Sequence, residues 1–153
     1  MMGRGLRNFL FVAVGLCMSA AFLAAQDGRT PAQGEKGAPP RNGWNVPPKA
    51  AEEKNPLTVN DGVLAAGKKL YGSKCQRCHG PEAKGNGQDA DPMHQQDMNL
   101  TVAARAGRNP DGVVFYKIWN GRTSPKMPRF SEELTKEQVW AIVAYVQTLR
   151  AKQ

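Results

Sequence analysis

Cys75-Gln76-Arg77-Cys78-His79 is the stretch that decides the fold of this chain. Two cysteines three residues apart, with a histidine directly after the second, form the pattern of covalent haem attachment. The spacing has a chemical reason, because one helical turn presents both thiols to the two vinyl groups on one edge of a porphyrin. The same turn leaves His79 beneath the iron as its proximal ligand. The motif therefore predicts one haem c, bound through thioether bonds to Cys75 and Cys78.

Closely spaced cysteines also occur in redox-active dithiols and in zinc sites. A zinc site needs two further ligands, and the remaining Cys and His residues are Cys17 and His94. A thioredoxin-like dithiol is expected in a βαβ setting, which the flanking sequence does not offer. A chance match in a loop is the third alternative. The strength of the motif favours haem over all three.

The N-terminus has the pattern of an export signal. Within residues 1–25, Arg4 and Arg7 precede an apolar run from Phe9 to Leu23. We expect cleavage after Ala25, with an uncleaved membrane anchor as the alternative, because the run approaches the length that spans a bilayer. Export agrees with covalent haem attachment, which takes place outside the cytoplasm.

Residues 26–57 have the composition of a linker, with six prolines, four glycines and few apolar residues. Such a stretch buries too little surface to offset its ordering entropy. We expect Trp44 within it to be exposed, with docking on the domain as the alternative. The remaining residues, 58–153, form the one domain for which a chain of 153 residues has room. The net charge of +8 is scattered rather than clustered, so the sequence predicts no nucleic-acid partner.

The domain reads as all-α, with three main helices and no convincing strand. The first helix is capped by Asn60 or Asp61 and is expected to end at Gly72. The second opens with Asn109 as its cap and Pro110 at its first position, and it ends at Asn120-Gly121. The last follows a capping box at Thr135-Lys136-Glu137-Gln138. Residues 80–109 are expected to form a long loop.

An iron with six ligands needs a second axial ligand opposite His79. Met93, Met98, Met127 and His94 are the candidates. Met127 is favoured because Pro128 rigidifies the backbone beside its sulfur, and because a loop between two helices can hold a thioether over the far face of the haem. A methionine filling the core is the alternative reading of Met127.

At this point the sequence resembles class I cytochrome c over about residues 58–151. The features that carry the resemblance are Gly67 and Tyr71, Cys75-x-x-Cys78-His79-Gly80, Gly85-Asn86-Gly87, Asn120-Gly121, Met127-Pro128-x-Phe130 and Ala144-Tyr145-Val146. Bacterial single-haem members and the haem-carrying subunit III of cbb3-type oxidases are similar. The resemblance implies a tight crossing of the first and last helices, with Gly67 allowing a close approach near Tyr145.

Further expectations concern the surroundings of the haem. A backbone carbonyl near Pro81 is expected to accept a hydrogen bond from the other ring nitrogen of His79. Arg105, Arg122 and Trp119 are candidate donors to the haem propionates, with a solvated charge or a core aromatic as the alternative reading.

The sequence thus predicts an exported electron carrier that passes single electrons between a redox donor and acceptor and is not an enzyme. A haem-carrying subunit of a periplasmic dehydrogenase or terminal oxidase is the alternative, with membrane association through the N-terminal segment. A haem enzyme or gas sensor without a strong sixth ligand, and a zinc-binding interaction module, are more distant possibilities.

Overall fold

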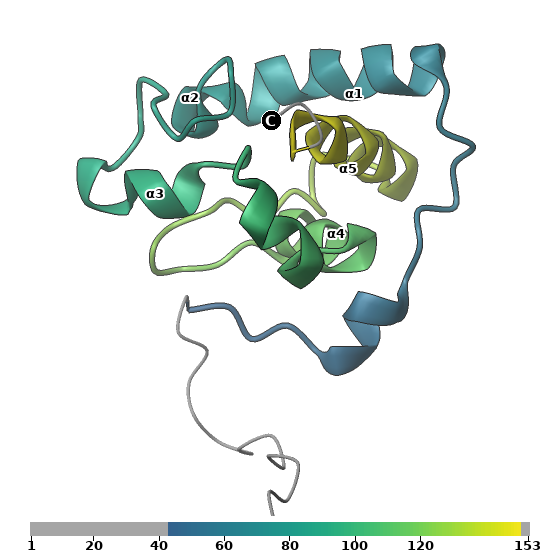
Figure 1. The fold of residues 1–153 in the computed structure, drawn as a ribbon, viewed down its shortest axis with the longest axis horizontal. Helices are drawn as coiled ribbons and strands as arrows, with labels where there is room; N and C mark the ends of the chain where they lie inside the picture. The colour runs from purple at the N-terminus through teal and green to yellow at the C-terminus, as the bar shows by residue number, and fades with distance from the viewer. Residues whose placement is uncertain (1–42, 151–153) are drawn as a thin grey trace, which may run out of the picture. The chain divides into compact units, whose positions relative to one another are not determined.

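The computed structural model of the protein describes residues 43–150, and these are helical (Figure 1). No strand occurs in this range, where the only β-type pairings are two isolated bridges. The all-α prediction is confirmed. The predicted signal or anchor of residues 1–25 and the first part of the predicted linker lie outside the described residues.

Helix α1 spans Asp61–Lys74. Its cap is Asn60, whose side chain accepts a hydrogen bond from the Val63 amide at 3.0 Å. The helix continues past Gly72, the predicted end, because the Cys75 amide still bonds to the Tyr71 carbonyl at 2.8 Å. α1 therefore runs almost directly into the attachment motif.

Helix α4 spans Asp111–Asn120 and helix α5 spans Lys136–Arg150. The cap of α4 is Pro110, one residue later than predicted. The capping box of α5 is confirmed, since the Thr135 amide donates to Gln138 Oε1 at 2.9 Å and the Gln138 amide donates to Thr135 Oγ1 at 3.3 Å. Both helices begin where local side-chain chemistry predicts, to within one residue.

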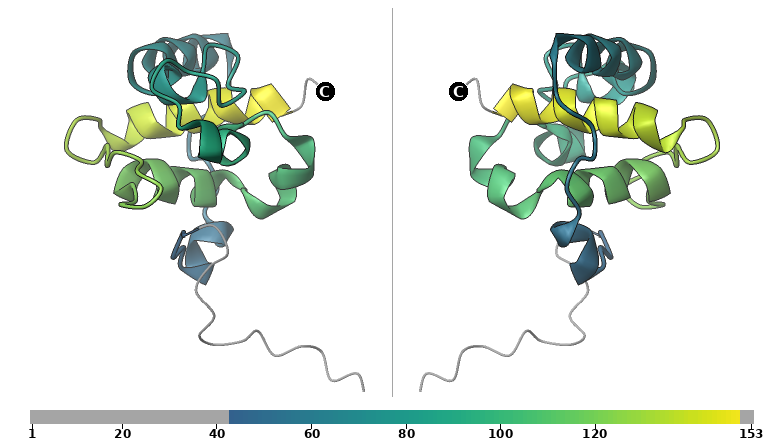
Figure 2. Two further views of the ribbon diagram at one scale, coloured as in Figure 1. Left: turned by 90° about the vertical axis from the view of Figure 1, so that its left-hand side faces the viewer. Right: turned by 90° about the vertical axis from the view of Figure 1, so that its right-hand side faces the viewer.

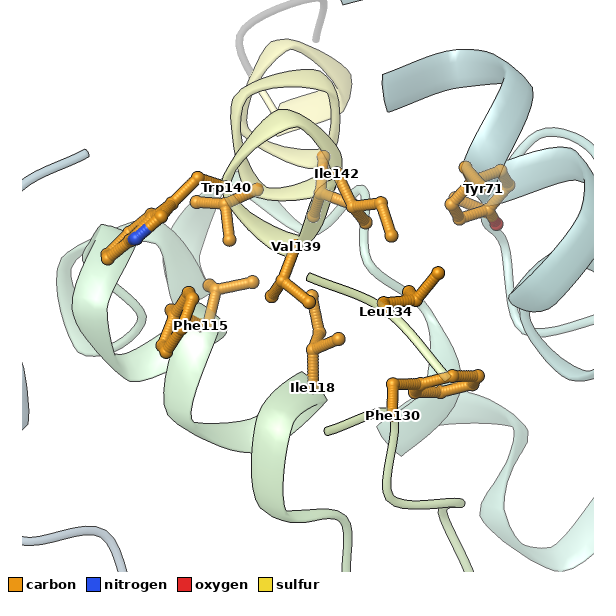
Figure 3. Packing of buried hydrophobic residues seen from close by; sticks show 12 residues of the cluster. Tyr71, Phe115, Ile118, Phe130, Leu134, Val139, Trp140 and Ile142 are labelled. Atoms are coloured by element: carbon orange, nitrogen blue, oxygen red, sulfur yellow. The ribbon is translucent and has the colours of Figure 1, made fainter. Parts of the chain in front are cut away.

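Helix α5 lies between α1 and α4, as both views in Figure 2 show. Val139, Ile142 and Val143 of α5 are fully buried. Figure 3 shows Val139 facing Phe115 and Ile118 of α4, and Ile142 on the side of Leu134 and Phe130, which come from the segment between α4 and α5. The rings of Phe115 and Trp140 stack with centroids 4.2 Å apart. This core holds the segments before and after α4 in place.

The predicted loop 80–109 contains short helices, which its many glycines and prolines obscured. They are η2 (Pro92–His94), α3 (Gln95–Met98) and η3 (Ala103–Arg108). Arg150, 9% exposed, anchors this region by donating to the carbonyls of Leu100 at 3.1 Å and Asn109 at 3.0 Å. The last turn of α5 therefore fixes the loop that faces the attachment motif.

Residues 43–57 correct part of the linker prediction, because they pack against the domain. They contain the short helix η1 (Pro48–Glu52), and Ala50 is buried with 8% exposure. Asn55 Nδ2 donates to the Trp140 carbonyl at 3.0 Å. Figure 1 shows this blue segment passing below α4 and rising to α1. Composition alone did not predict this packing, because η1 contacts α4, which is distant along the chain.

Candidate haem site

The five residues of the attachment motif form one continuous turn. It comprises Cys75 and the short helix α2 (Gln76–His79), which follows α1 at the upper left of Figure 1. The Cys78 amide bonds to the Cys75 carbonyl at 3.2 Å, and so does the His79 amide at 3.0 Å. Both cysteines are free thiols and partly exposed. The turn thus presents two thiols and one imidazole over a short length of chain.

The thiol of Cys75 lies at the edge of the hydrophobic core. Burial, assisted by the neighbouring Cys78, raises the pKa of Cys75 to about 12. Cys75 is therefore held as a neutral thiol. Its place against apolar side chains suits contact with the apolar rim of a porphyrin.

The imidazole of His79 is oriented by the backbone of a distant residue. His79 Nδ1 lies 2.7 Å from the carbonyl oxygen of Met98. Since a carbonyl only accepts, Nδ1 carries the proton and Nε2 keeps its lone pair. Burial lowers the pKa of His79, and the charge of Arg122 lowers it further, against the opposing effect of the Met98 hydrogen bond. The ring is thus neutral with Nε2 available, which is the form that ligates a metal.

The hydrogen-bond acceptor for His79 differs from the prediction. The sequence placed it near Pro81, two residues after the histidine, whereas the structure uses Met98, 19 residues away. The carbonyl of Gly80, next to Pro81, instead accepts a hydrogen bond of 2.7 Å from the hydroxyl of Tyr71. Nothing in the local sequence signals the role of Met98, because α3 delivers its carbonyl across the loop.

Met127 lies in the segment between α4 and α5, at the end of a closed turn. Its amide donates to the Arg122 carbonyl at 2.9 Å, and the Arg122 amide donates to the Met127 carbonyl at 2.9 Å. Gly121 has φ +61°, and a Cβ there would stand 2.6 Å from the Met127 carbonyl oxygen. Met127 is partly buried and packs against the core, as Cys75 does. Arg122, whose main chain pairs with Met127, is close enough to His79 for its charge to act on that ring.

The other candidate ligands lie in different settings. Met93 is 90% exposed. His94 Nδ1 forms a hydrogen bond of 2.7 Å with Asp91 Oδ2 at the surface. Met98 takes part in the site through its backbone carbonyl, as described above. Met93 is thus exposed, whereas Met98 and Met127 are both partly buried.

Four cations gather beside the site. Burial lowers the pKa of Lys117 to about 8, and the charges of Arg150, Arg122 and Arg105 lower it further. Lys117 Nζ donates to Asn109 Oδ1 at 2.5 Å, and Arg105 Nη1 donates to the Gln96 carbonyl at 2.5 Å. Such a cluster suits the two carboxylates of a haem. The sequence predicted Arg105 and Arg122 as propionate donors but not Lys117. Lys117 lies in the apolar helix α4, where no local pattern indicates that it meets these arginines.

Trp119, the third predicted propionate donor, stacks on Phe115 with ring centroids 5.6 Å apart and packs against the core. This is the setting of a core aromatic, the alternative that the sequence left open.

The donor set of the site fits haem c. It combines two free thiols and a neutral imidazole on one turn with a thioether from another segment and a nearby cationic cluster. Within residues 43–150, no group of three or more His, Cys, Asp or Glu side chains is placed to hold a metal ion by itself. In the same range no helix is both long and apolar enough to cross a membrane.

Comparisons with known proteins agree with this chemistry. The family model described as cytochrome c matches residues 64–150. Cytochrome c550 of Pseudomonas aeruginosa is 27% identical over 144 residues, which cover 92% of this chain and 91% of that protein. Cytochrome c6 of Parathermosynechococcus lividus is 29% identical over 89 residues, which cover 58% of this chain and 93% of that protein.

One similar solved structure is a chain of a Kuenenia stuttgartiensis reducing HAO-like protein complex. It is 27% identical with a TM-score of 0.52, and the match covers 63% of this chain and 49% of that one. The present chain thus spans about half the length of this structural relative.

Proposed function

Because the chain belongs to the cytochrome c family, we propose that it transfers single electrons through one haem c bound at Cys75 and Cys78. His79 and Met127 are the axial ligands in this proposal. Covalently bound c-type haem is the cofactor of the family, and electron transfer is its function. When bound, the haem supplies the one-electron chemistry, and the protein supplies attachment, ligands and electrostatics.

The orientation of His79 is the observation that carries this proposal. Its Nδ1 is 2.7 Å from the Met98 carbonyl, and this leaves Nε2 free to ligate iron beside the two thiols of the same turn. A hydrogen bond from the remote ring nitrogen also raises the basicity of the ligating one. The ring is thus carried by α2 and oriented by the carbonyl at the end of α3.

Met127 occupies the second axial position in the proposal. The paired amides and carbonyls of Arg122 and Met127 fix the backbone that carries the sulfur. A His/Met pair raises the reduction potential of a haem relative to two histidines. With both positions taken by side chains, no site is left for a substrate, and we infer a carrier rather than an enzyme.

The test of ligation is the oxidised protein with Met127→Ala. We expect the wild type to show the Met-to-iron charge-transfer band and the variant to lack it. Met93→Ala is the matched control, since Met93 is exposed, and it should retain the band. Retention of the band in Met127→Ala would contradict the assignment. Intact-mass analysis tests covalent attachment, because the wild type should carry the mass of one haem and the double variant Cys75→Ser/Cys78→Ser should lack it.

We further infer that the chain is exported, from the pattern of residues 1–25, and that it meets a redox donor and acceptor in the periplasm. The linker role of residues 26–42 belongs to the same proposal. Purification from membrane and soluble fractions with intact-mass analysis tests these points together. Cleavage after Ala25 and recovery without fixed partners are expected.

A haem-carrying subunit is the second candidate. This candidate is supported by the similar chain of the Kuenenia stuttgartiensis complex, because that chain is part of a larger assembly. Recovery of the protein in a constant ratio to another subunit would favour this candidate over the mobile carrier.

A further inference from the structure

We propose that Trp44 is a positioning residue for the sixth iron ligand, and that it acts on Met127 through the side chain of Arg122. The inference rests on the proposed function, because it takes Met127 to be an axial ligand. It concerns the segment before α1, whose composition predicted a linker.

The segment that carries Trp44 is held by packing at several points. A Cβ at Gly112 in α4 would stand 2.0 Å from the Ala50 carbonyl oxygen, so η1 and α4 approach as closely as backbones can. Asn55 Nδ2 donates to the Trp140 carbonyl at 3.0 Å. Because residues 50–55 are fixed in this way, the residues just before them are delivered to a defined place.

That place is the turn that carries Met127. In Figure 1 the blue chain begins at the lower left, beside the yellow-green segment between α4 and α5. A Cβ at Gly43 would stand 2.9 Å from the Ser124 carbonyl oxygen. The ring centroid of Trp44 is 4.6 Å from Cζ of Arg122 and 5.4 Å from Nζ of Lys117. Two cations from different segments thus meet one aromatic ring.

Charge explains why the ring matters. Lys117 and Arg122 are near enough for the charge of Arg122 to lower the pKa of Lys117. The face of an indole attracts cations, so Trp44 offsets their repulsion and keeps the Arg122 side chain in place. Arg122 in turn shares two backbone hydrogen bonds of 2.9 Å with Met127. Loss of the ring is therefore expected to loosen the base of the Met127 turn.

The experiment uses the full-length oxidised holoprotein and imidazole, which competes with Met127 for the iron. Its apparent Kd falls as the fraction of protein with the Met127 turn open rises. We expect Trp44→Ala to lower this Kd about two- to fivefold, the equivalent of one cation–π contact. Trp44→Phe keeps an aromatic face and should restore most of the difference.

A double-mutant cycle of Trp44→Ala and Arg122→Gln tests whether Trp44 acts through the side chain of Arg122. The two changes should be non-additive, because either one removes the same contact. Asn60→Ala is the control: it removes the cap of α1, outside the segment that carries Trp44, and should lower stability without changing the imidazole Kd. Additive effects in the cycle, or an equal change of the Kd in Asn60→Ala, would overturn the proposal.

Met127→Ala distinguishes a failure of the proposed role of Trp44 from a failure of the proposed iron ligation by Met127. If Met127→Ala loses the charge-transfer band but Trp44→Ala leaves the imidazole Kd unchanged, the role of Trp44 is wrong and the proposed function stands. If Met127→Ala keeps the band, the ligand assignment itself is wrong.

Discussion

Gly67 of α1 lies against the main chain of Ala141 in α5, so closely that a Cβ on Gly67 would stand 2.0 Å from the Ala141 carbonyl oxygen. The same Cβ would be 3.0 Å from Cβ of Tyr145. One turn further along α1, the rings of Tyr71 and Tyr145 are 5.5 Å apart. The crossing of α1 over α5 therefore depends on a missing side chain. Since α1 leads directly into the attachment turn, this crossing also sets where Cys75 lies.

Gly67→Ala is expected to destabilise the holoprotein by about 1–3 kcal/mol, because the added methyl group pushes two backbones apart. Chemical denaturation followed by circular dichroism measures this. Gly72→Ala is the matched control in the same helix, where the nearest atom to an added Cβ is Gln76 Oε1 at 3.8 Å. That change should leave stability equal or raise it by up to about 1 kcal/mol, as alanine favours a helix. Equal losses in both variants would contradict the packing argument.

Tyr71→Phe removes the hydroxyl that donates to the Gly80 carbonyl at 2.7 Å. Gly80 is buried, so its carbonyl would lose this partner away from solvent, and we expect a cost of about 1–3 kcal/mol. Thermal unfolding of the holoprotein is the measurement. Tyr116→Phe, on the partly exposed face of α4, serves as the control and should change stability by less than about 0.5 kcal/mol. A Tyr71→Phe variant as stable as the wild type would show that this hydrogen bond is not needed.

Gly121→Ala is expected to disturb the Met127 turn. Gly121 has φ +61° and ψ −171°, a region that only glycine occupies readily, and the strain costs about 1–3 kcal/mol. Under the proposed ligation, the charge-transfer band should weaken as well. Gly107→Ala is the comparison, because nothing lies within 4 Å of a Cβ at Gly107. The prediction fails if both variants keep the band at full strength.

The pH dependence of stability should reveal Lys117. Its folded pKa of about 8 is below the ordinary value of 10.5, chiefly through burial. Below pH 8 both states are protonated and folding bears the full cost of the buried charge. Between pH 8 and 10.5 the unfolded chain binds more protons, so this group raises stability as pH rises.

Lys117→Met removes that cost. Allowing for the partial exposure of the side chain, we expect it to be more stable than the wild type by about 1–2 kcal/mol at pH 7. The advantage should shrink as pH rises through the same window, and denaturant titrations at several pH values measure it. A constant difference between the two proteins would instead mean that an anion, such as a haem propionate, neutralises Lys117 in the holoprotein.

Sequence patterns predicted the parts of this protein that depend on near neighbours. The capping box at Thr135 and Gln138 was predicted because both hydrogen bonds join residues three apart. The predicted end of α1 at Gly72 was wrong, because the helix continues to Lys74 and the Cys75 amide still bonds to the Tyr71 carbonyl. A glycine weakens a helix but ends it only where the following residues leave the helical path.

By itself the sequence determined that the domain is all-α, as residues 43–150 are, and that two thiols and an imidazole share one turn. The reason is that spacing along a helix fixes which side chains lie together. Only the tertiary structure decided that the Met98 carbonyl orients His79 and that Trp44 reaches Arg122. These partners are far apart in the chain. They meet because the packing of α5 between α1 and α4, and of η1 on α4, brings their segments together, and no local pattern encodes that packing.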